Sequence, residues 1–245
     1  MLINYGAQQE EELIMPVASK AYILKIDTPI SNEYAEICAK SCERVGISWS
    51  YFHGFMGMMG QEAWLKTGIK MKFTEAKGKP PNTDRERAEC CSAGHGAIWK
   101  TISDGPDEAA IILEHDAVML HPMKLDIPDG VIVVLGYKLP NPSKYDHALA
   151  GPPIELIDIK GHEGAHAYAI TRNTARMMVD EIETRGIIGC VDNAYFIEKE
   201  RKTKNKLMIA SPTPAIGWLR ESTIWRKAAH RNAPFIESFK ESLES

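Results

Sequence analysis

The sequence predicts one α/β domain, a sheet flanked by helices, within a chain of 245 residues. Three observations predict this class. A strand–helix–strand pattern opens the chain, wholly apolar runs typical of buried central strands occur twice, and a capped amphipathic helix follows a later strand. We expect an acidic leader over 1–20, the α/β domain over 21–210, and a C-terminal extension over 211–245 that packs on the same domain.

The opening pattern covers residues 21–52. The apolar run 21–26 (AYILKI) predicts a buried strand, and 47–52 (ISWSYF) predicts a second one. Between them, apolar residues recur at three- and four-residue steps from Tyr34 to Val45, which predicts a helix. Its expected boundary residues are Ser31 or Asn32 as the N-cap and Gly46 as the stop.

The periodic pattern is lost over 54–82, where Gly, Met, Lys and Pro are frequent. This segment is a candidate mobile loop, and such loops either close over ligands or are plain surface insertions. Periodicity returns over 88–102, which predicts a helix that ends at the turn Asp104-Gly105-Pro106.

The second half of the chain predicts further strands and one helix. The runs 109–113 (AAIIL) and 131–135 (VIVVL) are apolar throughout, as in strands covered on both faces. Strands are also expected over 154–159 and 165–171. Thr171 is then placed to cap a helix that ends at Gly186.

Composition excludes several classes of protein. No run approaches the roughly 20 apolar residues of a membrane-spanning helix, and the start of the chain lacks the order of a signal peptide, so we expect a cytoplasmic protein. The five cysteines do not resemble a disulfide framework and are expected to be reduced. Cys38 and Cys42 have helical spacing, which suits core packing better than metal binding.

The net charge of −4 argues against binding of a nucleic-acid duplex by bulk electrostatics. A local basic and aromatic segment nevertheless occurs over 218–231. It is either a binding patch or, as we favour, a solvated amphipathic helix.

An acidic pair follows the predicted strand 109–113. Open α/β sheets bind ligands at the carboxyl edge of their strands, and there the sequence reads Glu114-His115-Asp116. If the strand geometry persists, the side chains of Glu114 and Asp116 share one face and can hold Mg²⁺ or Mn²⁺, which also bind phosphate oxygens. The alternative is an exposed acidic turn.

Four blocks, in order, resemble glycosyltransferase family 25, the lipopolysaccharide-type and collagen-type glycosyltransferases. The blocks are 21–26 with its helix and 47–52, CSAGHGAIWK over 91–100, IILEHDAVML over 111–120, and GAHAYAIT over 164–171 followed by Ala175 and Val191-Asp192. The chain departs from the family pattern at His115, where an Asp is usual, and at Gly94, where a Ser is common. It also lacks the arginine expected soon after Asp27.

The resemblance implies a GT-A fold, a Rossmann-type mixed sheet flanked by helices. It also implies transfer of a hexose, with inversion, from a nucleotide-sugar donor, expected to be a UDP-sugar, to an acceptor hydroxyl. Manganese or magnesium would be the cofactor, and the acceptor would be a glycan such as lipooligosaccharide, a protein side chain, a small molecule or a hydroxymethylated DNA base. The residues implied are Glu114, Asp116 and His166 for the metal, Lys25, Asp27, His95 and Tyr168 for donor or substrate binding, and Asp192 as the catalytic base.

Two of these assignments have structural alternatives. Asp192 is placed equally well to cap a helix over 193–198. His95 either positions substrate or satisfies a buried hydrogen bond.

Two other functions are compatible with the sequence. His162-Glu163-Gly164-Ala165-His166 fits the zinc-hydrolase pattern His-Glu-x-x-His, with Glu181 or Glu183 as a third ligand. That pattern requires a helix, which the glycines at 161 and 164 disfavour. The other alternative is a module that binds nucleotide sugars without turnover.

Overall fold

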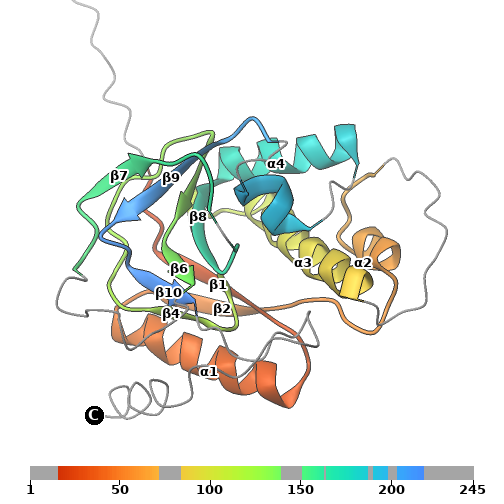
Figure 1. The fold of residues 1–245 in the computed structure, drawn as a ribbon, viewed down its shortest axis with the longest axis horizontal. Helices are drawn as coiled ribbons and strands as arrows, with labels where there is room; N and C mark the ends of the chain where they lie inside the picture. Colours follow the sequence, from red (N-terminus) through yellow and green to blue (C-terminus); the bar gives the residue numbers. More distant parts are fainter. Residues whose placement is uncertain are drawn as a thin grey trace, which may run out of the picture.

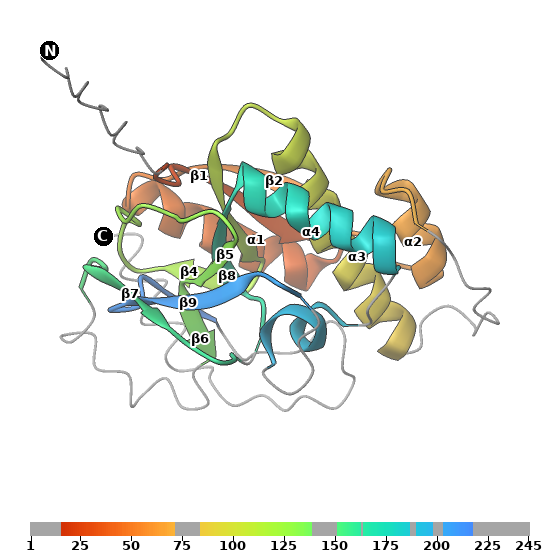
Figure 2. The same cartoon turned by 90° about the horizontal axis from the view of Figure 1, so that it is seen from above.

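A seven-stranded mixed sheet lies at the centre of the fold, with helices on both of its faces (Figures 1 and 2). The computed structural model describes residues 16–71, 84–138, 151–162, 164–186, 190–197 and 203–217. The strands lie in the order β2-β1-β3-β8-β5-β9-β7. Their bounds are Lys20–Lys25 (β1), Ser48–His53 (β2), Ala109–Glu114 (β3), Val131–Val134 (β5), Glu155–Asp158 (β7), Ala167–Thr171 (β8) and Lys206–Ser211 (β9). The predicted α/β class with a mixed, helix-flanked sheet is confirmed.

The strand directions explain where a site can form. β1, β2 and β3 are parallel, so their carboxyl ends share one edge of the sheet. β8 is antiparallel to both β3 and β5, which brings its first residues to that same edge. β9 is parallel to β5, and β7 is antiparallel to β9.

A small second sheet continues directly from the first. It contains β4 (Ala117–Met119), β6 (Gly136–Lys138) and β10 (Ala215–Gly217), in the order β4-β10-β6. Only His115 and Asp116 separate β3 from β4, so the chain crosses between the sheets at the predicted acidic motif. β10 belongs to the expected C-terminal extension, whereas the basic and aromatic segment 218–231 lies outside the described residues.

The helices divide the core into two layers. α1 (Pro29–Arg44) packs on one face of the main sheet, and its Cys38 and Cys42 are fully buried there, as expected for core packing. The other helices lie on the opposite face and contribute to the second core cluster: α2 (Gly60–Lys66), α3 (Asp84–Asp104), α4 (Arg172–Arg185) and a π-helix (Asp192–Phe196). None of the described helices is long and apolar enough to cross a membrane.

The helix boundaries test the capping predictions. Thr171 caps α4 as predicted, because its side chain accepts a hydrogen bond from the backbone N–H of Thr174. Gly186 follows the last residue with φ of 82°. The N-cap of α1 is Thr28, so the predicted caps Ser31 and Asn32 are wrong. The helix begins earlier because Pro29 suits the first helical position.

The candidate loop over 54–82 contains a short helix that the sequence analysis missed. α2 occupies Gly60–Lys66, and the Trp64 side chain packs into the core beside α3. Residues 72–83 of the segment lie outside the described residues, as do 1–15 of the leader.

Candidate functional site

The topology brings the ends of three strands together at one edge of the sheet. Leu24, near the end of β1, is in register with Glu114 at the end of β3. The backbone N–H of Glu114 donates to the carbonyl of His166, just before β8, at 2.8 Å. Such carboxyl edges are where open α/β sheets bind ligands.

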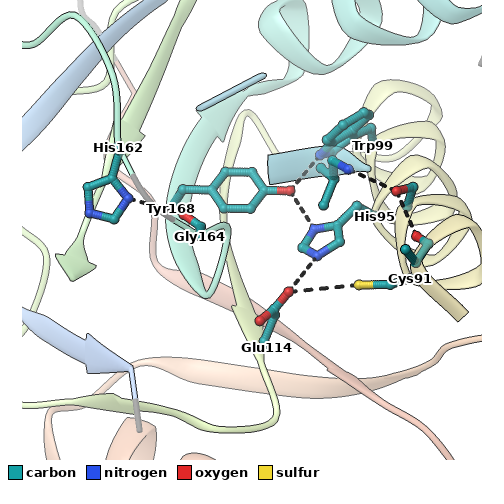
Figure 3. A network of polar contacts seen from close by, with 10 residues as sticks. Cys91, His95, Trp99, Glu114, His162, Gly164 and Tyr168 are labelled. Carbon is teal, nitrogen blue, oxygen red and sulfur yellow. Dashed lines mark hydrogen bonds and ion pairs between the residues drawn. The ribbon is translucent and has the colours of Figure 1, made fainter. Parts of the chain in front are cut away.

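The side chain of Glu114 makes two contacts with α3 at this edge (Figure 3). Its Oε1 lies 3.2 Å from Nε2 of His95 and 3.9 Å from Sγ of Cys91, both on α3. Side chains along β3 point alternately to the two faces of the sheet. Glu114 therefore points to the same face as Ile112, two residues earlier, which packs on the α3 side. With 22% of its side chain exposed, Glu114 joins the buried network to the surface.

His95 lies in the interior and contacts no solvent. Its Nδ1 is 2.9 Å from Oη of Tyr168, and Nε1 of Trp99 donates to the same Oη at 2.7 Å. Cys91, His95 and Trp99 lie one turn apart along α3, which places them on one helix face. The spacing was visible in the block 91–100, but the sequence analysis did not identify Cys91 and Trp99 as site residues.

Tyr168 lies in the interior, behind Glu114 and His95. Its side chain is fully buried, and its ring packs edge-on against Phe196 with ring centroids 5.3 Å apart. Burial raises the pKa of Tyr168 far above its usual range, so the hydroxyl keeps its proton. In the structure Tyr168 and His95 connect to the edge through Glu114, and their predicted roles in donor or substrate binding stay predictions.

Asp116 and His115 do not continue the geometry of β3. The strand ends at Glu114 and the two residues form a turn, so the expectation that Glu114 and Asp116 share a strand face is wrong. Since the chain turns into the small sheet, His115 instead stacks on Tyr34 of α1, with ring centroids 6.0 Å apart and planes at 14°. Burial lowers the pKa of His115, which favours its neutral form.

The segment that carries Asp192 is bonded to α3. The backbone N–H of Val191 donates to Oγ of buried Ser92 on α3 at 2.9 Å, which fixes the preceding residue to the helix that carries Cys91. Asp192 is the first residue of the π-helix, whose N-cap is Val191, so the alternative that Asp192 is an N-cap is wrong.

The negative charges of three carboxylates act on the Cys91 thiol. Burial raises the pKa of Cys91 well above its usual value, and the negative charges of Glu114, Asp192 and Asp116 raise it further. The Cys91 thiol is therefore protonated and can donate to Glu114. Of these carboxylates, Asp192 alone is distant in sequence from Glu114, and the bond from Val191 to Ser92 ties its segment to α3.

Lys25 and Asp27 lie at the end of β1, on the same edge. Nζ of Lys25 donates to Oδ1 of Asn32 at 2.6 Å and lies 4.8 Å from the centroid of the Tyr51 ring. Asp27 is exposed, and its Oδ1 is 3.5 Å from Nδ2 of Asn32. Both side chains are close enough to the surface to meet a ligand, as the donor-binding prediction requires.

The His162–His166 segment is not a zinc-hydrolase helix. Its described residues are irregular, Gly164 has φ of 92°, and β8 begins at Ala167. Nδ1 of His162 is 3.1 Å from the carbonyl oxygen of Gly164. The proposed third ligands face elsewhere, since Glu181 accepts from the backbone of Lys204 and Glu183 from that of Lys70. Glu163 lies outside the described residues.

Comparisons with known proteins give no family. No protein-family model and no curated protein matches the chain. Among solved structures, galactosyltransferase LgtC in complex with donor and acceptor sugar analogs is similar at 10% identity, with a TM-score of 0.47 over 92% of this chain and 96% of that chain. The glycosyltransferase GlyE of Streptococcus pneumoniae TIGR4 gives 9% identity and 0.40 over 93% and 64%. Scores this low do not establish a function, which rests on the site's own residues.

The donor set at the edge tests the expected metal. Glu114, Asp116 and Asp192 offer hard carboxylate oxygens, which suit Mg²⁺ or Mn²⁺. Among the described residues, the group of three ligand atoms that lie within 4.8 Å of one another comprises Cys91, His95 and Glu114. The predicted trio with Asp116 and His166 does not form such a group. His166 is buried, and its ring lies against Gly217 of β10.

Proposed function

We propose that the protein is a metal-dependent glycosyltransferase that moves a hexose from a nucleotide sugar, with UDP as its nucleotide, to an acceptor hydroxyl. The observation that carries this proposal is the position of Glu114 at the carboxyl edge shared by β1 and β3, beside the helix to which the segment carrying Asp192 is bonded through Val191 and Ser92. The four blocks that resemble glycosyltransferase family 25 all contribute to this edge, although they are spread from residue 21 to residue 192.

The residues at the edge have separate roles in this proposal. Glu114 and Asp116 hold the divalent cation, Mn²⁺ or Mg²⁺, which when bound would offset the charge of the diphosphate leaving group. Lys25 and Asp27, at the end of β1, bind the donor. The His166 side chain is buried beside β10, so we do not assign it a contact with the diphosphate. Its carbonyl oxygen instead accepts the hydrogen bond from the backbone N–H of Glu114.

Asp192 is the proposed catalytic base. A carboxylate that takes the acceptor proton as the hydroxyl attacks the anomeric carbon increases the nucleophilicity of the oxygen. The carbon–oxygen bond to the diphosphate breaks on the opposite side, so a single displacement inverts the anomeric centre. The tie between Val191 and Ser92 holds Asp192 in place for this step.

A thermal-shift screen of nucleotide sugars, with and without Mn²⁺, tests the proposal. We expect a UDP-sugar to stabilise the wild type only when Mn²⁺ is present, because a ligand at 100 times its Kd adds about 2.7 kcal/mol. Glu114→Gln and Asp116→Asn should lose this stabilisation, since each removes a negative charge at nearly constant size. Glu36→Gln, in an exposed ion pair on α1, is the matched control and should respond like the wild type.

The outcomes separate the competing functions. Stabilisation by Zn²⁺ alone, with no response to any nucleotide sugar, would contradict the proposal. Donor binding without hydrolysis or transfer to any member of an acceptor panel would favour a non-catalytic binding module. The panel should contain a lipooligosaccharide, a peptide, simple sugars and hydroxymethylated DNA, because each offers the required hydroxyl.

A further inference from the structure

A buried chain of hydrogen bonds runs from α3 through β8 to Glu114. Trp99, Tyr168 and His95 are at most 1% exposed, and they link in the order Trp99–Tyr168–His95–Glu114 at 2.7, 2.9 and 3.2 Å (Figure 3). Two of the contributing elements, α3 and β3, follow one another in the chain, whereas β8 comes much later in the sequence. Only its last member, Glu114, reaches the surface.

The direction of each hydrogen bond follows from the groups themselves. The indole N–H of Trp99 can only donate, so Oη of Tyr168 accepts that bond. The hydroxyl proton of Tyr168 then has Nδ1 of His95 as its acceptor within the described structure. With Nδ1 accepting, the proton of a neutral His95 lies on Nε2 and is donated to Oε1 of Glu114.

The opposite tautomer fits the same atoms less well. If Nδ1 of His95 carried the proton, Oη of Tyr168 would receive two donors, and its own buried proton would lose the acceptor that His95 offers. Nε2 would then present a lone pair to the negatively charged Oε1 of Glu114. The surroundings of Tyr168 therefore select the Nε2–H form.

We propose that Trp99, Tyr168 and His95 are positioning residues that set the orientation of the Glu114 carboxylate. The inference rests on the proposed function and names residues that support its metal-binding site without touching metal or sugar. With Oε1 held by His95 and Cys91, and the backbone held by His166, the plane of the carboxylate is set before a ligand arrives.

A zinc site built from Cys91, His95 and Glu114 is the competing interpretation of these atoms. A metal ion bound through Nε2 of His95 would require that nitrogen to lose its proton. The chain of hydrogen bonds from Trp99 to Glu114, called the relay below, places the proton on that nitrogen. Because His95 donates this hydrogen bond, we expect it to support the carboxylate of Glu114 and not to act as a metal ligand.

The first experiment measures the tautomer. Long-range nitrogen–carbon NMR of histidine-labelled protein distinguishes Nε2–H, Nδ1–H and doubly protonated rings, and His95→Gln identifies the His95 signals by their loss. We expect the Nε2–H form in the wild type and a changed pattern in Tyr168→Phe, which removes the hydroxyl and keeps the ring. A wild-type Nδ1–H or doubly protonated ring would overturn the inference.

The second experiment measures binding of a UDP-sugar with Mn²⁺ by calorimetry. Loss of an outer-shell partner typically weakens metal affinity about 10- to 100-fold, so we expect at least a 10-fold weaker Kd in Tyr168→Phe and in His95→Leu. His95→Gln should recover much of the loss, because the glutamine amide can donate from about the position of Nε2. Recovery would not follow from a purely structural defect.

Tyr195→Phe is the matched control. Tyr195 is also a buried tyrosine that packs on Trp99, with ring centroids 4.8 Å apart, but its hydroxyl has no hydrogen-bond partner among the described residues. We expect its Kd to stay within about 2-fold of the wild type, which corresponds to about 0.4 kcal/mol. Equal losses in Tyr195→Phe and Tyr168→Phe would overturn the inference.

The remaining outcomes separate the inference from the function on which it rests. Wild-type binding that is unchanged in Tyr168→Phe overturns the relay alone. No donor binding by the wild type overturns the proposed function and the role of the relay in it. Stoichiometric Zn²⁺ binding that is lost in Cys91→Ser and His95→Gln overturns the relay in favour of a zinc site.

Discussion

The backbone N–H of Val191 donates to the buried Oγ of Ser92, and this 2.9 Å bond joins α3 to the segment that carries Asp192. The two residues are 99 positions apart in the sequence. One hydroxyl group thus couples the helix behind Glu114 to the proposed base.

Removal of that hydroxyl should impair catalysis more than stability. In Ser92→Ala we expect a kcat about 10-fold lower, because Asp192 loses its anchor, and a free energy of unfolding lower by about 1 kcal/mol, as for one buried hydrogen bond. Steady-state kinetics and urea unfolding measure the two effects. Thr101→Ala removes an α3 hydroxyl that also donates to a carbonyl one turn earlier, that of Ala97, but at an exposed position, and it should leave kcat unchanged. Equal kcat in both variants would contradict the coupling.

Substitution of the proposed base should separate binding from turnover. Asp192→Asn keeps the size of the side chain but cannot accept the acceptor proton, so kcat should fall about 100- to 10,000-fold. The Kd for the UDP-sugar with Mn²⁺ should change little. Asp180→Asn, at an exposed position of α4, provides the comparison. A variant that retains wild-type kcat would remove Asp192 from the mechanism.

Gly217 is expected to be intolerant of any side chain. A Cβ at this position would lie 2.5 Å from Cδ2 of the buried His166 ring, beside the backbone that supports Glu114. Gly217→Ala should therefore lower the free energy of unfolding by about 1–3 kcal/mol, as for overpacking elsewhere. Gly151→Ala, where a Cβ meets no atom within 4 Å, is the control in the same urea series. Similar midpoints for both variants would show that His166 can move aside.

Cys90 should make stability fall at high pH. Burial raises the pKa of its thiol from 9.0 to about 11, so between these values the unfolded chain loses a proton that the folded chain keeps. The stabilising contribution is complete below pH 9 and is lost as the pH rises through 11. Relative to Cys90→Ala, the wild type should lose stability over that window and show a constant difference from pH 7 to 8.5. A difference that is constant up to pH 11 would contradict the raised pKa.

Local pattern was sufficient for the main elements of the fold. β1, α1, β3 and α4 each combine an apolar period with a recognisable boundary, and each forms within a few residues of its predicted range. The three short strands β4, β6 and β10 were not predicted, because they have three residues each and depend on partners distant in sequence. β9 was also missed.

The residues of the proposed site have local signals in the sequence, but the directions of their side chains do not. The acidic motif and Asp192 were identified from the sequence, whereas the strand assumption for Asp116 failed because the chain leaves the sheet after Glu114. The contact of Tyr168 with His95 spans 73 positions and has no local signal. Such partners follow from the pairing of β3 with β8, which only the three-dimensional fold specifies.

The two-residue crossing from β3 to β4 restricts how the proposed enzyme can work. Neither sheet can slide past the other at this joint without displacing Glu114, because His115 and Asp116 leave no slack between the strands. We therefore expect the proposed metal-binding corner to be rigid and to be formed before substrate arrives. Discrimination among donors at this corner should therefore follow from fit to a fixed shape, and any motion that accompanies turnover must originate in other elements.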